Sequence, residues 1–203
     1  MRKPFTILCF LLSQHCFSQD SLLLKVHFLY GSKPKKTFRT EEQKWFGGKW
    51  GGHVGVEVDS NQILNFLPKG KFHWIEKPAN RHSVYALHSY QSFYRILGDV
   101  EPAKKTIIYI PISLTQKLEF DSLKTTYLQQ TPYDYALLGM RCGAAAYDIL
   151  AHLDILKQHG RRTTFTKVFY PKKLRKQLLK KASANDWKTT QENGSERRKW
   201  EKD

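Results

Sequence analysis

Apolar residues in the first half of the chain alternate with polar ones or form short continuous runs, a pattern typical of β-strands. The strand-like runs are residues 22–30, 53–58, 63–67, 72–76, 84–87 and 106–111. The runs 53–58 and 63–67 flank a short polar stretch, Asp59-Ser60-Asn61-Gln62. This spacing predicts a β-hairpin centred between Ser60 and Asn61, whereas residues 91–97 fit either a strand or a helix.

Helical patterns dominate the second half of the chain. Ser113 and Gln116 form a capping box, which predicts a helix that ends near Gln129. A second helix is predicted from Cys142 to about Leu156, because apolar side chains recur there at core spacing. Since strand-like segments come first and helical ones later, we expect one α+β domain.

The last quarter of the chain is strongly basic. Residues 157–203 contribute +10 of the net charge of +16. Within it, residues 171–182 begin with a proline and carry leucines at helical spacing, which predicts a short basic amphipathic helix. We expect this helix to dock with its basic face in solvent; the alternative is contact with an anionic surface. Residues 184–203 are polar and aperiodic, which predicts a disordered tail.

The first residues have the pattern of a signal peptide. Arg2 and Lys3 precede the apolar run 5–12, and Cys16-Phe17-Ser18 is a small-x-small cleavage site, so residues 1–19 are interpreted as the signal. The mature domain would then be residues 20–183, in the periplasm or outside the cell. The apolar run is too short to span a bilayer, which takes about 20 residues. The alternative is a buried N-terminal element of a cytosolic protein.

Export would leave Cys142 as the one thiol of the mature chain, because Cys9 and Cys16 lie in the signal. A thiol at a helix N-terminus faces unpaired backbone amides and the positive end of the helix dipole, which favour the thiolate. Arg141 adds positive charge beside it. The pattern predicts a cysteine nucleophile whose own amide stabilises an oxyanion. The alternative is a buried cysteine packed among the alanines that follow.

His53, at the start of a predicted strand, is the candidate general base. Asn65 lies on the next strand in an apolar run, where an unpaired amide would be costly, so we predict that it orients the His53 ring. Glu57 and His73 are the alternative orienting residues. Tyr133 and Tyr135 precede the cysteine; packing is their expected role, and donation to an oxyanion is the alternative.

The order of these residues resembles the circularly permuted papain-like group, which includes lecithin:retinol acyltransferase-like proteins and permuted NlpC-type peptidases. The resemblance rests on His53-Val54-Gly55-Val56, on Asn65 in the following strand and on Cys142 at a later helix start. It implies an antiparallel sheet packed against helices and thiol hydrolysis or acyl transfer on an amide or ester. An Asn-Cys pair is common in the group, whereas Arg141 precedes the cysteine here.

The substrate expected from export and basic charge is a peptide amide of the cell envelope, with an acyl lipid as the alternative. Trp50 and Trp74 flank the His53 region and could line an apolar or sugar-stacking cleft. No cofactor and no metal are expected, since the histidines lack zinc-site spacing. Export disfavours nucleic acid, and no segment is long enough to span a membrane. The remaining alternatives are a non-catalytic envelope-binding module with a buried Cys142, and a metal hydrolase.

Overall fold

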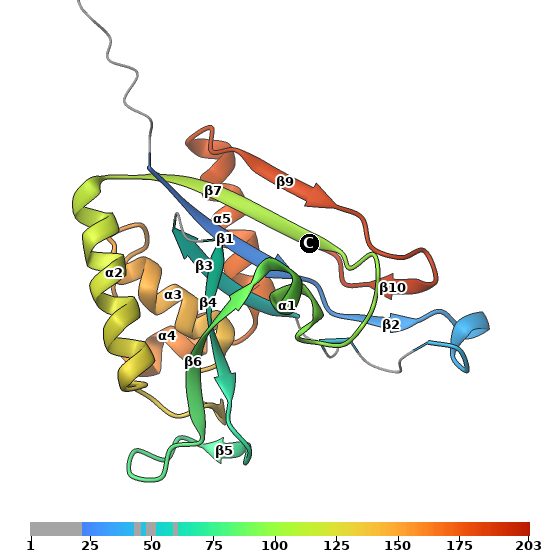
Figure 1. Ribbon diagram of the computed structural model, residues 1–203, viewed down its shortest axis with the longest axis horizontal. Helices are drawn as coiled ribbons and strands as arrows, with labels where there is room; N and C mark the ends of the chain where they lie inside the picture. Colours follow the sequence, from blue (N-terminus) through green and yellow to red (C-terminus); the bar gives the residue numbers. More distant parts are fainter. Residues whose placement is uncertain (1–21, 43–45, 48–51, 59–60) are drawn as a thin grey trace, which may run out of the picture.

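The computed structural model describes residues 22–42, 46–47, 52–58 and 61–203, which form a mixed α/β fold. A six-stranded sheet with the order β6-β4-β3-β1-β7-β9 lies at its centre (Figure 1), and all neighbouring strands are antiparallel. These strands are β1 (Leu22–Leu29), β3 (His53–Val58), β4 (Gln62–Pro68), β6 (Ser83–Ser89), β7 (Lys105–Ile112) and β9 (Thr189–Glu192). The predicted signal peptide, residues 1–19, lies outside the described residues.

Helices cover both faces of this sheet, with α1 in front of it and α5 behind it in Figure 1. The helices are α1 (Tyr90–Arg95), α2 (Leu114–Gln129), α3 (Cys142–His152), α4 (Arg161–Lys167) and α5 (Pro171–Ala184), with a 3-10 turn at Lys36–Phe38. The capping box predicted at Ser113 is present, and α2 ends at the predicted residue. Among the described residues, no helix has the length and apolar character that crossing a membrane requires.

The alternation of side chains along β3 divides its residues between two environments. Val54, Val56 and Val58 belong to the main core, together with the buried face of α3. The intervening positions include Gly55, where a Cβ atom would lie 2.8 Å from the ring of Phe93 in α1. Because Gly55 has no side chain, this aromatic ring can lie against the sheet beside His53, at 5.5 Å between ring centroids.

The hairpin of β3 and β4 is shifted by one residue from the predicted register. Gly55 pairs with Asn65 and Val56 with Leu64, so the hairpin is centred on residue 60 rather than between residues 60 and 61. This shift matters because a one-residue change moves side chains to the other face of a strand. In the observed register, Asn65 and His53 lie on the same face of the sheet. The described pairing of β3 with β4 consists of the two residue pairs given above.

The C-terminal residues are ordered, which corrects the prediction of a disordered tail at 184–203. β9 extends the central sheet beside β7, and β10 (Arg198–Trp200) pairs with β2 (Ser32–Pro34). Trp200 packs edge-on against Phe46, with ring centroids 5.7 Å apart. Long-range contacts of this kind order a polar segment that has no periodic pattern of its own. The predicted domain boundary at residue 183 therefore does not separate a folded part from an unfolded one.

α5 docks through its apolar side, as the sequence predicts. Leu174 and Leu178 are fully buried in the main core, while Lys173, Lys176 and Lys180 are exposed. The same helix buries Arg175, whose guanidinium is held by two carboxylates near the C-terminus, Glu201 at 2.9 Å and Asp203 at 2.6 Å. Its apolar face is therefore already occupied by the protein's own core.

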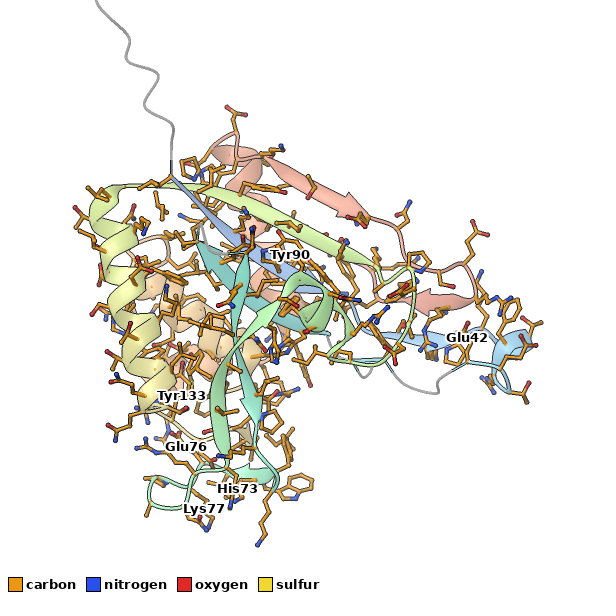
Figure 2. All side chains as sticks on the ribbon, in the orientation of Figure 1. Glu42, His73, Glu76, Lys77, Tyr90 and Tyr133 are labelled. Carbon is orange, nitrogen blue, oxygen red and sulfur yellow. The ribbon has the colours of Figure 1, made fainter. Side chains whose placement is uncertain are left out.

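A small two-stranded parallel sheet projects from the lower end of the molecule in Figure 1, where β5 (His73–Ile75) pairs with β8 (Ala136–Leu138). We call this sheet and its loop, residues 68–82 and 136–138, the β5–β8 tip. Asp134 stabilises it as a buried carboxylate that accepts hydrogen bonds from His73 Nδ1 and from the amides of Lys77 and His82. Figure 2 shows His73 and Lys77 together at this end.

Candidate active site

Cys142, His53 and Asn65 are brought together in one buried, hydrogen-bonded row. The His53 imidazole is hydrogen-bonded to the Cys142 thiol and, through Nε2, to Asn65 Oδ1 at 2.9 Å. The three residues come from the start of α3, the start of β3 and the middle of β4. The structure thus brings together the three side chains that the sequence indicates as a candidate nucleophile, base and orienting amide.

The contacts of Asn65 determine which nitrogen of His53 carries a proton. Asn65 Nδ2 donates to the carbonyl oxygens of Ile63 at 3.2 Å and Ala86 at 3.1 Å. Because carbonyl oxygens only accept, the amide orientation is fixed and Oδ1 faces His53. His53 Nε2 must then carry its hydrogen and donate to Oδ1, which leaves Nδ1 to accept the thiol proton. This tautomer is the one that a general base for Cys142 requires.

His88 on β6 extends the row and was not identified as part of it from the sequence. Its Nδ1 lies 2.8 Å from Asn65 Nδ2, so it shares the two hydrogens of that amide with the carbonyl oxygens of Ile63 and Ala86. Burial and the neighbouring charge of His53 both lower the pKa of His88, which favours the neutral ring that can accept. A single strand histidine carries no pattern that would reveal this role.

The electrostatics of the pair favour a thiolate and an imidazolium. Burial alone would raise the pKa of the Cys142 thiol, but the charge and hydrogen bond of His53, with Arg141 and Tyr135, outweigh it and hold the pKa below the ordinary 9.0. Burial would lower the pKa of His53, but Cys142 and the Asn65 hydrogen bond raise it above 6.5. Each shift favours the charged form of its group, the thiolate of Cys142 and the imidazolium of His53. Both residues are 4% exposed, so water screens the pair weakly.

The start of α3 supplies further positive potential. Its first turn contains no acidic residue, and the N-cap residue, Arg141, makes no capping hydrogen bond through its side chain. Gly143 permits the close approach of α5, because a Cβ atom there would lie 2.9 Å from the nitrogen of Pro171. The first backbone amides of a helix have no partner within it, so the Cys142 N–H is a suitable oxyanion donor.

Tyr135 has a more direct role than the expected packing. Its hydroxyl is hydrogen-bonded to both the Cys142 thiol and the Arg141 side chain. Burial, followed by the charge of Cys142, raises the pKa of this phenol, which keeps it protonated as a donor. Its ring stacks on Phe66, with centroids 5.1 Å apart, and this contact fixes the hydroxyl beside the sulfur.

The two alternative orienting residues are engaged elsewhere. Glu57 accepts hydrogen bonds from Lys25 and His27, both at 2.8 Å; burial opposes the shift, but these partners lower its pKa to about 2. His73 lies in the β5–β8 tip, bonded to Asp134 and to His82. The structure therefore favours Asn65 over both.

The predicted substrate-binding tryptophans are not confirmed. Trp50 lies outside the described residues, and Trp74 is 72% exposed on β5. Phe72, four residues after Pro68 in the same loop, is the aromatic residue of the tip that approaches the site, with its ring 5.9 Å from that of Tyr135.

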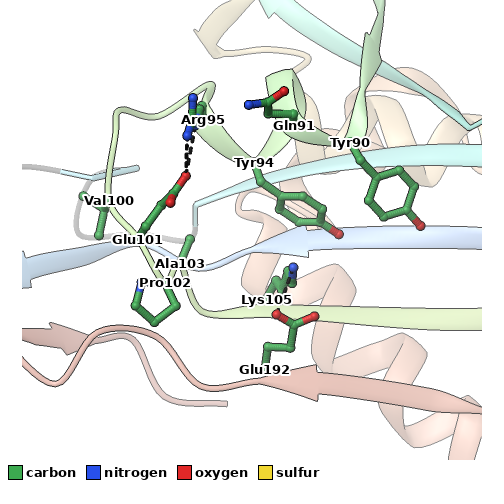
Figure 3. Close-up of a pocket in the computed structure, with 10 residues that line it drawn as sticks. All are labelled: Tyr90, Gln91, Tyr94, Arg95, Val100, Glu101, Pro102, Ala103, Lys105 and Glu192. Carbon is green, nitrogen blue, oxygen red and sulfur yellow. Dashed lines mark hydrogen bonds and ion pairs between the residues drawn. The ribbon is translucent and has the colours of Figure 1, made fainter.

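A cavity of about 610 Å³ lies away from this row, between α1, β7 and β9 (Figure 3). Its lining includes Tyr90, Tyr94, Lys105 and Glu192 but none of the predicted catalytic residues. Within the described ranges, no group of three or more His, Cys, Asp or Glu side chains could hold a metal ion. The cavity thus lies apart from the row of Cys142, His53 and Asn65.

Comparisons with protein-family models, with curated proteins and with solved structures find no match to this chain.

Replacing Asn65 with alanine would leave a buried N–H of His53 unpaired and its ring free to turn. We expect a decrease of roughly 10- to 100-fold in the rate of Cys142 alkylation at pH 6, in line with the cost of an unsatisfied buried donor. Asn80→Ala, at an exposed position between β5 and β6, serves as the matched control and should leave the rate unchanged. A wild-type rate in Asn65→Ala would show that the amide does not position the base.

Proposed function

We propose that this protein is an exported, papain-like thiol hydrolase or acyltransferase, with Cys142 as nucleophile, His53 as general base and Asn65 as the residue that positions the base. The observation that carries the proposal is the hydrogen-bonded row of these three side chains, with the thiol at a helix N-terminus. The order His, Asn, Cys on an antiparallel sheet and a later helix supports a permuted papain-like arrangement.

The geometry supports a two-step reaction. The Cys142 thiolate attacks the substrate carbonyl carbon, and the resulting oxyanion accepts a hydrogen bond from the Cys142 amide. When the C–N or C–O bond breaks, the His53 imidazolium gives its proton to the leaving amine or alkoxide, and a thioester remains. Water or another acceptor then loses a proton to His53 as it attacks the thioester, which releases the acyl group and restores the thiolate–imidazolium pair.

The first candidate substrate is an amide in a cell-envelope peptide, and the second is the ester of an acyl lipid. The second is favoured by the β5–β8 tip, where Phe72, Trp74, Ile75 and Leu138 are between 48% and 72% exposed. Lysines 69, 71 and 77 in the same loop are also exposed. Aromatic rings beside lysines suit the boundary between lipid and water.

The reaction class is tested by incubating the mature protein with peptide amides and with acyl esters and looking for the trapped thioester by mass spectrometry. An adduct on the peptide that contains Cys142 supports the proposal. If neither substrate class leaves an adduct or is turned over, while the protein is folded, the non-catalytic binding module becomes the better account.

If the substrate is an acyl lipid, the exposed apolar residues of the β5–β8 tip should affect the rate of its hydrolysis. Replacing Trp74 and Ile75 with serine should lower the hydrolysis of an ester presented in anionic vesicles roughly tenfold or more, because buried apolar area drives interfacial binding. Hydrolysis of a short soluble ester should be unchanged. Leu118→Ser on α2 is the matched control, since this leucine is 61% exposed but lies on another element. Equal losses on both esters would rule out a lipid-docking role for the tip.

A further inference from the structure

Arg141 carries buried hydrogen-bond donors without acceptors. Neither its Nε nor its Nη1 has a partner within the part of the chain that the structure describes, and both atoms are inaccessible to solvent. The guanidinium lies against two aromatic rings, 4.9 Å from the centroid of Phe169 and 5.2 Å from that of Tyr170. Aromatic faces attract the cation but leave its in-plane N–H groups unsatisfied.

Arg141 is partly buried as a residue, and the two arginines that are buried have carboxylate partners. Arg175 is paired with Glu201 and Asp203, and Arg198 with Glu42 at 3.0 Å. Among the described residues, no carboxylate forms an ion pair with Arg141. Since burying an unpaired charge is costly, a purely structural arginine would be expected to have a partner of this kind. The missing carboxylate sets Arg141 apart, since Arg175 also retains a buried Nη2 without a hydrogen-bond partner. The absence of such a carboxylate among the described residues points to an acceptor that arrives with a ligand.

Arg141 lies beside the candidate nucleophile. The Tyr135 hydroxyl is hydrogen-bonded to both Arg141 and Cys142, and the charge of Arg141 lowers the pKa of the thiol. The thiolate already has His53 as its partner, and the first turn of α3 contains no acidic residue. A guanidinium and a helix N-terminus thus converge beside the sulfur without a carboxylate of their own.

We infer that Arg141 is an anion-binding residue of the active site, and that the substrate carries a carboxylate next to the carbonyl that Cys142 attacks. The inference rests on the proposed function and names the substrate class. Arginine is suited to this role because its planar donors match carboxylate oxygens and its charge is permanent. The substrate would be held by its carboxylate while the neighbouring acyl carbon faces Sγ.

Two alkylating reagents that differ only in charge test this inference. In both, the Cys142 thiolate forms a bond to the methylene carbon and iodide leaves; iodoacetate carries a carboxylate where iodoacetamide carries a neutral amide. We expect iodoacetate to react about 10- to 100-fold faster than iodoacetamide with the native protein, as charged hydrogen bonds would give. In Arg141→Met, the ratio of the two rates should fall to near one, and Arg141→Lys should retain part of it.

The ratio separates failure of this inference from failure of the proposed function. Rapid alkylation by iodoacetamide at low pH without any preference for iodoacetate would overturn the role of Arg141 and leave the nucleophile in place. Slow alkylation by both reagents would overturn the proposed function itself. Arg161→Met is the matched control, because that arginine is paired with Glu76 at 2.9 Å and is half-exposed.

A second measurement avoids dependence on the folding of Arg141 variants. Acetate, added to the native protein, should occupy the carboxylate site and slow alkylation by iodoacetamide in a saturable manner. Chloride at the same ionic strength is the control for screening. The absence of saturable protection by acetate would contradict a carboxylate site beside the thiol.

Discussion

Replacing Cys142 with serine is expected to abolish acyl transfer, with a decrease of about 10⁴-fold or more in turnover of the substrate that the native protein cleaves. Serine fits the same volume, but its hydroxyl is not ionised by His53 in the way that a thiol is, so the attacking anion is lost. The measurement is the rate of product release, together with the mass of any adduct at residue 142.

The fold of this variant has to be verified, because Cys142 is part of the main core. An unchanged circular dichroism spectrum and a urea midpoint close to that of the native protein would show that the loss is chemical. Turnover within about tenfold of the native rate would mean that another group is the nucleophile.

The second large effect concerns stability and the C-terminal residues. Arg175 has a fully buried side chain, and its partners Glu201 and Asp203 lie at the end of the chain. Replacing both acids with their amides would leave a buried guanidinium without a counter-ion, so the free energy of unfolding should fall by about 3–5 kcal/mol. Urea denaturation measures this change. Lys176→Ala, on the exposed side of the same helix, should change it by less than about 0.5 kcal/mol.

The same ion pair predicts a dependence on pH. Burial opposes the shift, but the hydrogen bonds from Arg175 and Tyr30 hold the pKa of Asp203 below its ordinary 3.8. A carboxyl whose pKa is lower in the folded state stabilises the fold above the unfolded value, and this stabilisation is lost as the pH falls through the folded value. The destabilisation in Asp203→Asn should therefore be full at neutral pH and disappear in acid. If the C-terminal residues were disordered, neither effect would be seen.

The candidate site could be predicted from the sequence because its parts carry local signals. A histidine at the start of a strand, a short turn and an amide in an apolar run together indicate His53 and Asn65, and a thiol before a run of alanines indicates the start of a helix. The hairpin register was wrong by one residue, because the turn residues did not fix the centre of the hairpin. The observed register places Asn65 on the face that its role requires.

The structured C-terminal segment and the contacts of Tyr135 and His88 could not be predicted from the sequence, because they depend on contacts between distant residues. The ion pair of Arg198 with Glu42 joins residues 156 positions apart, and that of Arg175 with Asp203 joins residues 28 positions apart. Such pairs leave no periodic pattern, so the C-terminal segment was predicted to be disordered. The contacts of Tyr135 and His88 with the site also depend on tertiary packing, which local sequence does not encode.

The most direct test of the account is the rate of Cys142 alkylation by iodoacetamide from about pH 4 to about pH 10, in the native protein and in His53→Ala. The lowered pKa of Cys142 predicts labelling below the pH at which an ordinary thiol ionises, and the raised pKa of His53 predicts that the imidazolium persists above 6.5. In His53→Ala, labelling at pH 6 should fall by up to roughly 300-fold, since an unperturbed thiol with a pKa of about 8.5 is then about 0.3% ionised. Slow labelling of the native thiol, or identical profiles in the two folded proteins, would contradict a catalytic pair.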